Sequence, residues 1–189
     1  MENNVLTTLA ELCLRLRARF NAIDTIVDVF STMQRAKQVL IFLPDKLEDF
    51  GIVRVFIADI RDAFPNAKIT FVLRYNYITL LDRNIRDTIS TLALRPEHIT
   101  RFGFPTKQVI ATIKKFNFEI ALDLNHEFNL LSAHLCFISG APLRICLSDK
   151  KRDPFFNFQV QANKNMKLEN IYKNFIRYIT LTESSPISA

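Results

Sequence analysis

Apolar and polar residues follow two different patterns along this chain. Continuous or mostly apolar runs predict buried strands at residues 38–43, 68–73, 88–94, 118–124 and 142–147. Stretches with apolar residues at helical spacing follow these runs, at residues 51–64, 77–82, 106–116, 127–139 and 167–181. Strands that alternate with helices in this way predict a parallel sheet covered by helices on both faces. We therefore expect an α/β fold built on a single Rossmann-like sheet.

The residues before the first strand form a separate pattern. Residues 4–20 place leucines and other apolar residues at helical spacing beside several arginines, and a second short helix is expected at 24–35. A basic amphipathic helix suits an anionic glycolipid, a membrane surface or a partner protein, and it equally suits packing on its own domain. We expect a helical extension at 1–36, the Rossmann-like domain at 37–181 and a disordered tail at 182–189.

The small number of glycines and the spacing of the cysteines and histidines limit which cofactors and metals the chain is able to bind. The chain has three glycines, three cysteines and three histidines among 189 residues. Loops that cradle phosphate need several glycines, so a nucleotide site of that kind is excluded and we expect no cofactor. The cysteines and histidines show no metal-binding spacing. We therefore expect no metal site, and reduced thiols packed as small apolar residues.

Charge and hydropathy bear on partners and location. The net charge is +6, which favours an anionic partner but also serves solubility alone. The basic run at 150–152 precedes Phe155 and Phe156, and charge beside aromatic rings is able to bind a nucleic acid strand. The chain has no nucleic-acid-binding motif, so we expect no nucleic acid partner. We expect this segment to be a mobile loop with both rings turned inward. No apolar run reaches the roughly 18 residues of a membrane span. We expect a cytoplasmic protein, peripheral to the inner face of the membrane if residues 4–20 bind lipid.

Several segments, taken in order, resemble a known family. "FPNAKITFV" (64–72) and "SGAPLRI" (139–145) are the most specific, and "FEIALDLN" (118–125) lies between them. Together with the strand at 39–43, they resemble the N-terminal half of the family 9 glycosyltransferases, the heptosyltransferases of lipopolysaccharide synthesis and their relatives. The resemblance covers residues 37–181. It implies half of a GT-B fold, in which two Rossmann-like domains face each other and the N-terminal one holds the acceptor sugar.

The resemblance also implies a site in the loop after the first strand. It makes Asp49 the candidate general base, with Glu48 where the family usually has glycine. From its own position directly before a helical pattern, Asp49 is expected to be a helix N-cap. Asp45, Lys46 and Glu48 are candidates for acceptor or partner binding. Otherwise the two carboxylates pair with Lys46 or are simply solvated.

A second candidate group follows the fourth strand. Asp123 ends a buried run and is expected to cap the next turn, while Asn125 and His126 stand where the family usually has Gln and Gly. His126 either has a functional role in the loop or is a solvated loop residue. Arg144 is expected to hold the end of the fifth strand by ion pairing or carbonyl contacts. These four residues complete the candidate acceptor- or partner-binding set.

Two functional hypotheses fit these observations. We expect the chain to lack the nucleotide-sugar half of the family, and a transferase needs both substrates oriented together. The first hypothesis is a non-catalytic, glycosyltransferase-like binding or scaffold subunit that acts with a protein partner or as a homo-oligomer. The alternative is the acceptor-binding half of a split glycosyltransferase, which transfers a sugar from a nucleotide sugar to a phosphorylated glycolipid.

Overall fold

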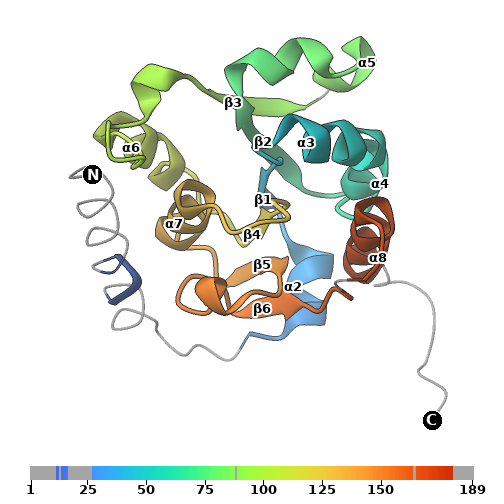
Figure 1. Cartoon of the computed structure of the whole chain (residues 1–189). Helices are drawn as coiled ribbons and strands as arrows, with labels where there is room; N and C mark the ends of the chain where they lie inside the picture. The colour runs from blue at the N-terminus through green and yellow to red at the C-terminus, as the bar shows by residue number, and fades with distance from the viewer. Residues whose placement is uncertain (1–11, 13, 17–26, 88, 164, 181–189) are drawn as a thin grey trace, which may run out of the picture.

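A six-stranded, fully parallel sheet forms the centre of the molecule (Figure 1). The computed structural model describes residues 12, 14–16, 27–87, 89–163 and 165–180. The strands are β1 (Gln38–Phe42), β2 (Lys68–Arg74), β3 (Ser90–Leu94), β4 (Ile120–Asp123), β5 (Leu143–Leu147) and β6 (Phe158–Val160). Their order is β3-β2-β1-β4-β5-β6. This is the order of a doubly wound Rossmann-like sheet, which confirms the expected fold class.

Helices cover both faces of the sheet. The α-helices are α2 (Val29–Arg35), α3 (Leu47–Val53), α4 (Ile57–Asp62), α5 (Arg83–Arg86), α6 (Lys107–Lys114), α7 (Leu130–Ile138) and α8 (Leu168–Thr180). Short 3-10 helices are η1 (Arg54–Phe56), η2 (Tyr75–Leu80), η3 (Pro96–His98) and η4 (Lys150–Arg152). Side chains of α2, α3, α4 and α8 share one apolar cluster with the sheet, and those of α6 and α7 share the other. The two layers of helices therefore bury both faces of the strands.

The central strand β1 shows how the sequence produces this burial. Val39 and Ile41 belong to the cluster under α3, α4 and α8, whereas Leu40 and Phe42 belong to the opposite cluster. Successive side chains of a strand point to opposite faces, so a strand buried on both faces is apolar at every position. The continuous apolar runs in the sequence result from this double burial.

Two expectations about the elements were wrong. The segment at 158–160 was expected to be loop, but it forms the edge strand β6, which pairs with β5 at Ile145, Cys146 and Leu147. A three-residue strand containing Gln159 has too short a pattern to be recognised. The helix expected at 51–64 begins instead at Leu47 and is interrupted by the 3-10 turn η1.

The N-terminal extension is described only in part. Most of the helix expected at 4–20 lies outside the described residues, as do residues 24–26 and the tail expected at 182–189. Within the described part, Arg15 lies over the Phe128 ring at 5.3 Å and donates a hydrogen bond to the Lys151 carbonyl. The division at residues 36 and 37, and lipid binding through 4–20, stay predictions. No helix in the described part of the chain is long and apolar enough to span a bilayer.

Candidate ligand-binding cleft

A cleft of about 630 Å³ lies at the carboxyl ends of β1, β2 and β3. Ligands of doubly wound α/β proteins usually bind at this edge of the sheet. Apolar residues at the ends of the strands line part of the cleft, including Phe42, Val72 and Leu94. Polar side chains from the last residue of β2 and from the segments that follow the strands line the rest, among them Asp45, Arg74, Tyr75, Asn76, Arg95, Thr100 and Asn125. The cleft therefore combines an apolar part with polar groups drawn from several loops, as ligand sites commonly do.

Asp45 and Arg74 form a bidentate ion pair in this cleft. Arg74 Nε donates to one carboxylate oxygen of Asp45, and Arg74 Nη2 donates to the other at 2.6 Å. The Asp45 backbone N–H also donates to Asn125 Oδ1 at 2.8 Å, and the Tyr77 hydroxyl donates to the Asp45 carbonyl at 2.9 Å. The expectation that Asp45 pairs with Lys46 or is solvated is thus wrong, because β2 brings Arg74 beside the loop after β1.

Arg95 is a cleft residue that the sequence reasoning missed. Its guanidinium carbon lies 4.3 Å from the centre of the Tyr75 ring, and Nη1 is 3.8 Å from Glu97. Both Arg95 and Tyr75 follow directly after a strand, β3 and β2 respectively. That position was the available signal, since the first residues after parallel strands meet at one edge of the sheet.

Asp123 is the centre of a buried polar network rather than a free cleft carboxylate. It accepts hydrogen bonds from the backbone and side-chain nitrogens of Asn125 and from Ser132 Oγ. Arg152 Nη1 lies 3.8 Å from Asp123 Oδ2, and both side chains are almost completely buried. Burial raises the pKa of the Asp123 carboxyl, and the charge of Arg152 opposes that shift. The expected capping of the turn after β4 is confirmed.

Arg152 comes from the basic run that was expected to be part of a mobile loop. It is fully buried, and its Nη2 donates to the Asn125 carbonyl at 2.6 Å and to the His126 carbonyl at 3.2 Å. This arginine therefore ties η4 to the loop after β4. The expected inward position of Phe155 and Phe156 is confirmed, since both rings are buried.

The structure contradicts the expectation that Asp49 is an N-cap. Lys46 occupies the N-cap position of α3, and Asp49 lies within the first turn. Asp49 is 6% exposed, and among the described residues no group donates a hydrogen bond to its carboxylate. Burial is the main reason that its pKa is raised, while the charges of His126 and Lys46 oppose the shift. Asp49 does not line the cleft that contains Asp45.

The other charged groups of this region lie on the outside of the loops. Lys46 forms an exposed ion pair with Glu127, which raises the pKa of Lys46 and lowers that of Glu127. Glu48, in the first turn of α3, and His126, in the loop after β4, are both exposed, as expected of solvated residues. The predicted pairing of Lys46 with Asp45 or Glu48 is replaced by one with Glu127, from the loop after β4.

Arg144 is separated from the cleft by the length of the sheet. It is the second residue of β5, so it lies near the amino ends of the strands. Its Nε and Nη1 donate to the carbonyls of Phe155 and Ala141, both at 2.7 Å. The expected carbonyl contacts are confirmed, but the structure does not bring Arg144 together with the other candidate site residues.

Sequence comparisons find no match for the chain, whereas a comparison with solved structures does. No family model and no curated protein sequence matches the chain. The fold itself is a single Rossmann-like α/β domain, and it matches about half of several solved glycosyltransferases.

The similar structures are of the family that the sequence resembles. A family 9 glycosyl transferase from Veillonella parvula has a TM-score of 0.60 and 19% identity, over 82% of this chain and 44% of its own. The E. coli ADP-heptose lipopolysaccharide heptosyltransferase II has a TM-score of 0.57 and 14% identity, over 79% and 44%. The E. coli heptosyltransferase WaaC with ADP has a TM-score of 0.54 and 12% identity, over 80% and 49%. The chain spans less than half the length of each, and the likeness is one of fold.

Proposed function

We propose that this chain is a non-catalytic, glycosyltransferase-like binding subunit whose cleft holds an anionic sugar. One observation carries the proposal. Asp45 is the one carboxylate among the described residues that line the cleft, and Arg74 occupies both of its oxygens. A general base must direct a free oxygen toward the hydroxyl proton that it removes. The cleft therefore offers binding groups but no available base.

The polar groups of the cleft suit an anionic carbohydrate. Among the residues that line the cleft, two arginines, Arg74 and Arg95, outnumber the single carboxylate of Asp45. Glu97, which lies 3.8 Å from Arg95, is outside this lining. Guanidinium groups bind phosphate and carboxylate groups with charge-assisted hydrogen bonds. The exposed ring of Tyr75 and the amide of Asn76 offer a flat apolar surface and hydrogen bonds to a sugar ring.

Isothermal titration calorimetry with a hexose phosphate and the matching unphosphorylated hexose tests this proposal. We expect the phosphorylated sugar to bind more tightly and Arg95→Ala to weaken its binding by roughly tenfold to a hundredfold, because a hydrogen bond to a charged group contributes about 1.5–3 kcal/mol. Arg101→Ala is the matched control, since Arg101 also lies over an aromatic ring, Phe102, but does not line the cleft. Equal effects of the two substitutions would contradict a site at Arg95.

A second candidate function is favoured by Asp49. Its carboxylate is buried at the start of α3, has a raised pKa and accepts no hydrogen bond from the described residues. These are properties of a general base. In this case the chain is the acceptor-binding half of a glycosyltransferase that transfers a sugar from a nucleotide sugar to a phosphorylated glycolipid.

A transfer assay separates the two candidates. The chain is purified from its host with any bound partner, and incorporation of sugar from labelled nucleotide sugars into glycolipid is measured. The binding-subunit proposal expects no transfer that depends on Asp49. Transfer that Asp49→Asn abolishes, with sugar binding retained, would establish the enzymatic candidate instead.

A further inference from the structure

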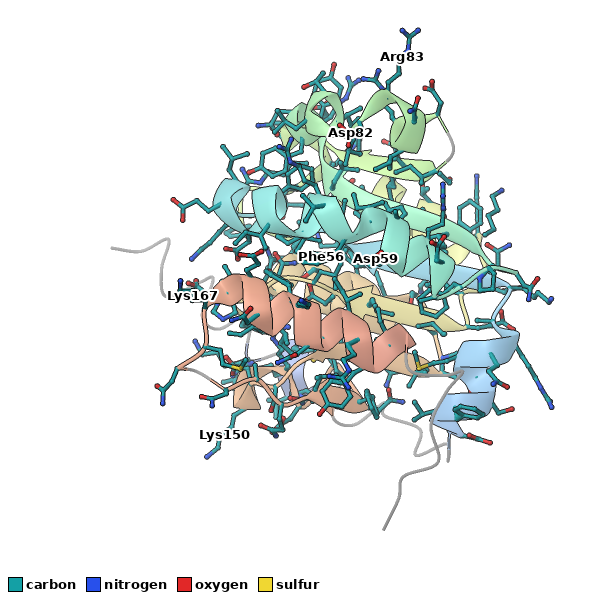
Figure 2. All side chains as sticks on the ribbon, turned by 90° about the vertical axis from the view of Figure 1, so that its right-hand side faces the viewer. Phe56, Asp59, Asp82, Arg83, Lys150 and Lys167 are labelled. Carbon is teal, nitrogen blue, oxygen red and sulfur yellow. The ribbon has the colours of Figure 1, made fainter. Side chains whose placement is uncertain are left out.

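A groove of about 910 Å³ lies between α2, α4 and α8, away from the cleft. Figure 2 shows this side of the molecule, with the labels of Phe56 and Asp59 between the α3–η1–α4 segment and α8. Met33 and Ile176 are buried at the groove, and the partly exposed Phe56 and the exposed Pro65 also line it. The groove therefore has apolar side chains at its base, combines them with polar and charged ones, and is open to a macromolecular partner.

The two walls of the groove carry opposite charges. Asp59 and Asp62 lie one turn apart on α4, and Lys173 and Arg177 lie one turn apart on α8. Among the described residues, Asp59 and Lys173 form no ion pair with each other or with any other group. An acidic wall and a basic wall thus face the same groove, with two charged residues on each.

We propose that this groove is the interface of a homodimer with two-fold symmetry. A two-fold axis brings the same patch of both copies together, so the patch must be complementary to itself. Here the acidic α4 wall of one copy meets the basic α8 wall of the other, and the reciprocal contact forms at the same time. A membrane surface or a nucleic acid fits poorly, because the acidic wall repels both.

An exposed aromatic residue of α2 extends the same surface. Phe30 is 54% exposed and lies on the face of α2 that carries Met33 and Gln34, both of which line the groove. Apolar and aromatic residues are enriched at the centres of protein interfaces, and charged residues at their rims. The proposed interface therefore has apolar contacts from α2 and η1 between two reciprocal sets of charge pairs.

Sedimentation velocity measurements on the full chain test the proposal. We expect the wild-type chain to dimerise as its concentration rises to about 100 μM and to dissociate more readily at high salt. The all-basic variant Asp59→Lys/Asp62→Lys and the all-acidic variant Lys173→Glu/Arg177→Glu should each bind themselves at least about a hundredfold more weakly, because like charges across an interface cost several kcal/mol. Mixing the two variants should restore a dimer with one copy of each.

Two substitutions of the same kind on other surfaces serve as controls. Asp82→Lys and Lys150→Glu change the charge at positions away from the groove (Figure 2) and should leave the dimer intact. A wild-type chain that stays monomeric would overturn the proposal. So would a dimer that survives both charge reversals, or two monomeric variants that fail to associate when mixed.

Discussion

Single residues hold together the loops at the carboxyl edge of the sheet. Asp123 and Arg152 are both fully buried, and together they contact Asn125, Ser132 and the His126 carbonyl. Among the described residues, Arg152 Nε and Nη1 have no hydrogen-bond partner, so the charge of Asp123 is their main compensation. Removing one member of a buried pair leaves the other charge uncompensated, which costs more than the pair itself contributes.

Arg152→Met should therefore lower the free energy of unfolding by about 3–5 kcal/mol. Adding Asp123→Asn should recover part of this loss, because the amide needs no counter-charge. Without Arg152, the pKa of Asp123 is raised further in the folded state, so the single variant should regain stability relative to wild type as the pH falls toward that pKa. Urea unfolding between pH 4 and pH 7 measures both effects. A double variant as unstable as the single one would argue against this role of the pair.

Helix boundaries depend on individual backbone conformations. Gly140 follows α7 with φ of 75°, the left-handed conformation expected of a residue that ends a helix. Gly51 lies inside α3, and a Cβ added there would meet no atom within 4 Å. The two glycines are therefore expected to have opposite effects on stability.

The early start of α3 was less predictable, because its N-cap residue Lys46 forms no side-chain cap hydrogen bond.

Substitution of these glycines by alanine tests this difference. Gly140→Ala should destabilise the protein by about 1–2 kcal/mol, because a left-handed residue with a Cβ is strained. Gly51→Ala should stabilise it by about 0.5–1 kcal/mol, since alanine loses less entropy in a helix. Thermal unfolding of both variants measures these shifts. If both substitutions change the stability in the same direction, the left-handed conformation at Gly140 does not explain the effect of its substitution.

The whole molecule consists of two apolar clusters on opposite faces of one sheet. Phe175 of α8 lies in one cluster, and Leu135 of α7 lies in the other. Alternate residues of the same strands supply both clusters, so neither can be lost without exposing the sheet that supports the other. A domain of this size and construction is expected to unfold as one cooperative unit.

Core truncations on the two faces should lower the same transition. Phe175→Ala is expected to cost about 3–5 kcal/mol and Leu135→Ala about 2–5 kcal/mol, from lost burial and the remaining cavity. Calorimetry should show one peak for the wild type and for each variant, at a fixed protein concentration. A second peak in one variant would show that the two faces unfold separately.

The sequence by itself determined the fold class and the places of five strands. The arrangement of apolar residues along a segment reflects its local backbone geometry. Mostly apolar runs such as 118–124 therefore predict strands without knowledge of the rest of the chain. The same local reasoning predicted the turn capped by Asp123, because that turn involves residues within a few positions of each other.

The tertiary structure alone decided which charged groups meet. Asp45 pairs with Arg74 across 29 residues, and Lys46 pairs with Glu127 across 81. These contacts follow from the strand order, which places β2 and β4 on either side of β1, and local patterns do not encode that order. The charged walls of the α2–α4–α8 groove likewise exist only because α8 returns to pack beside α4. Long-range packing, rather than a local sequence pattern, therefore assembles both the charged groups of the cleft and the charged walls of the groove.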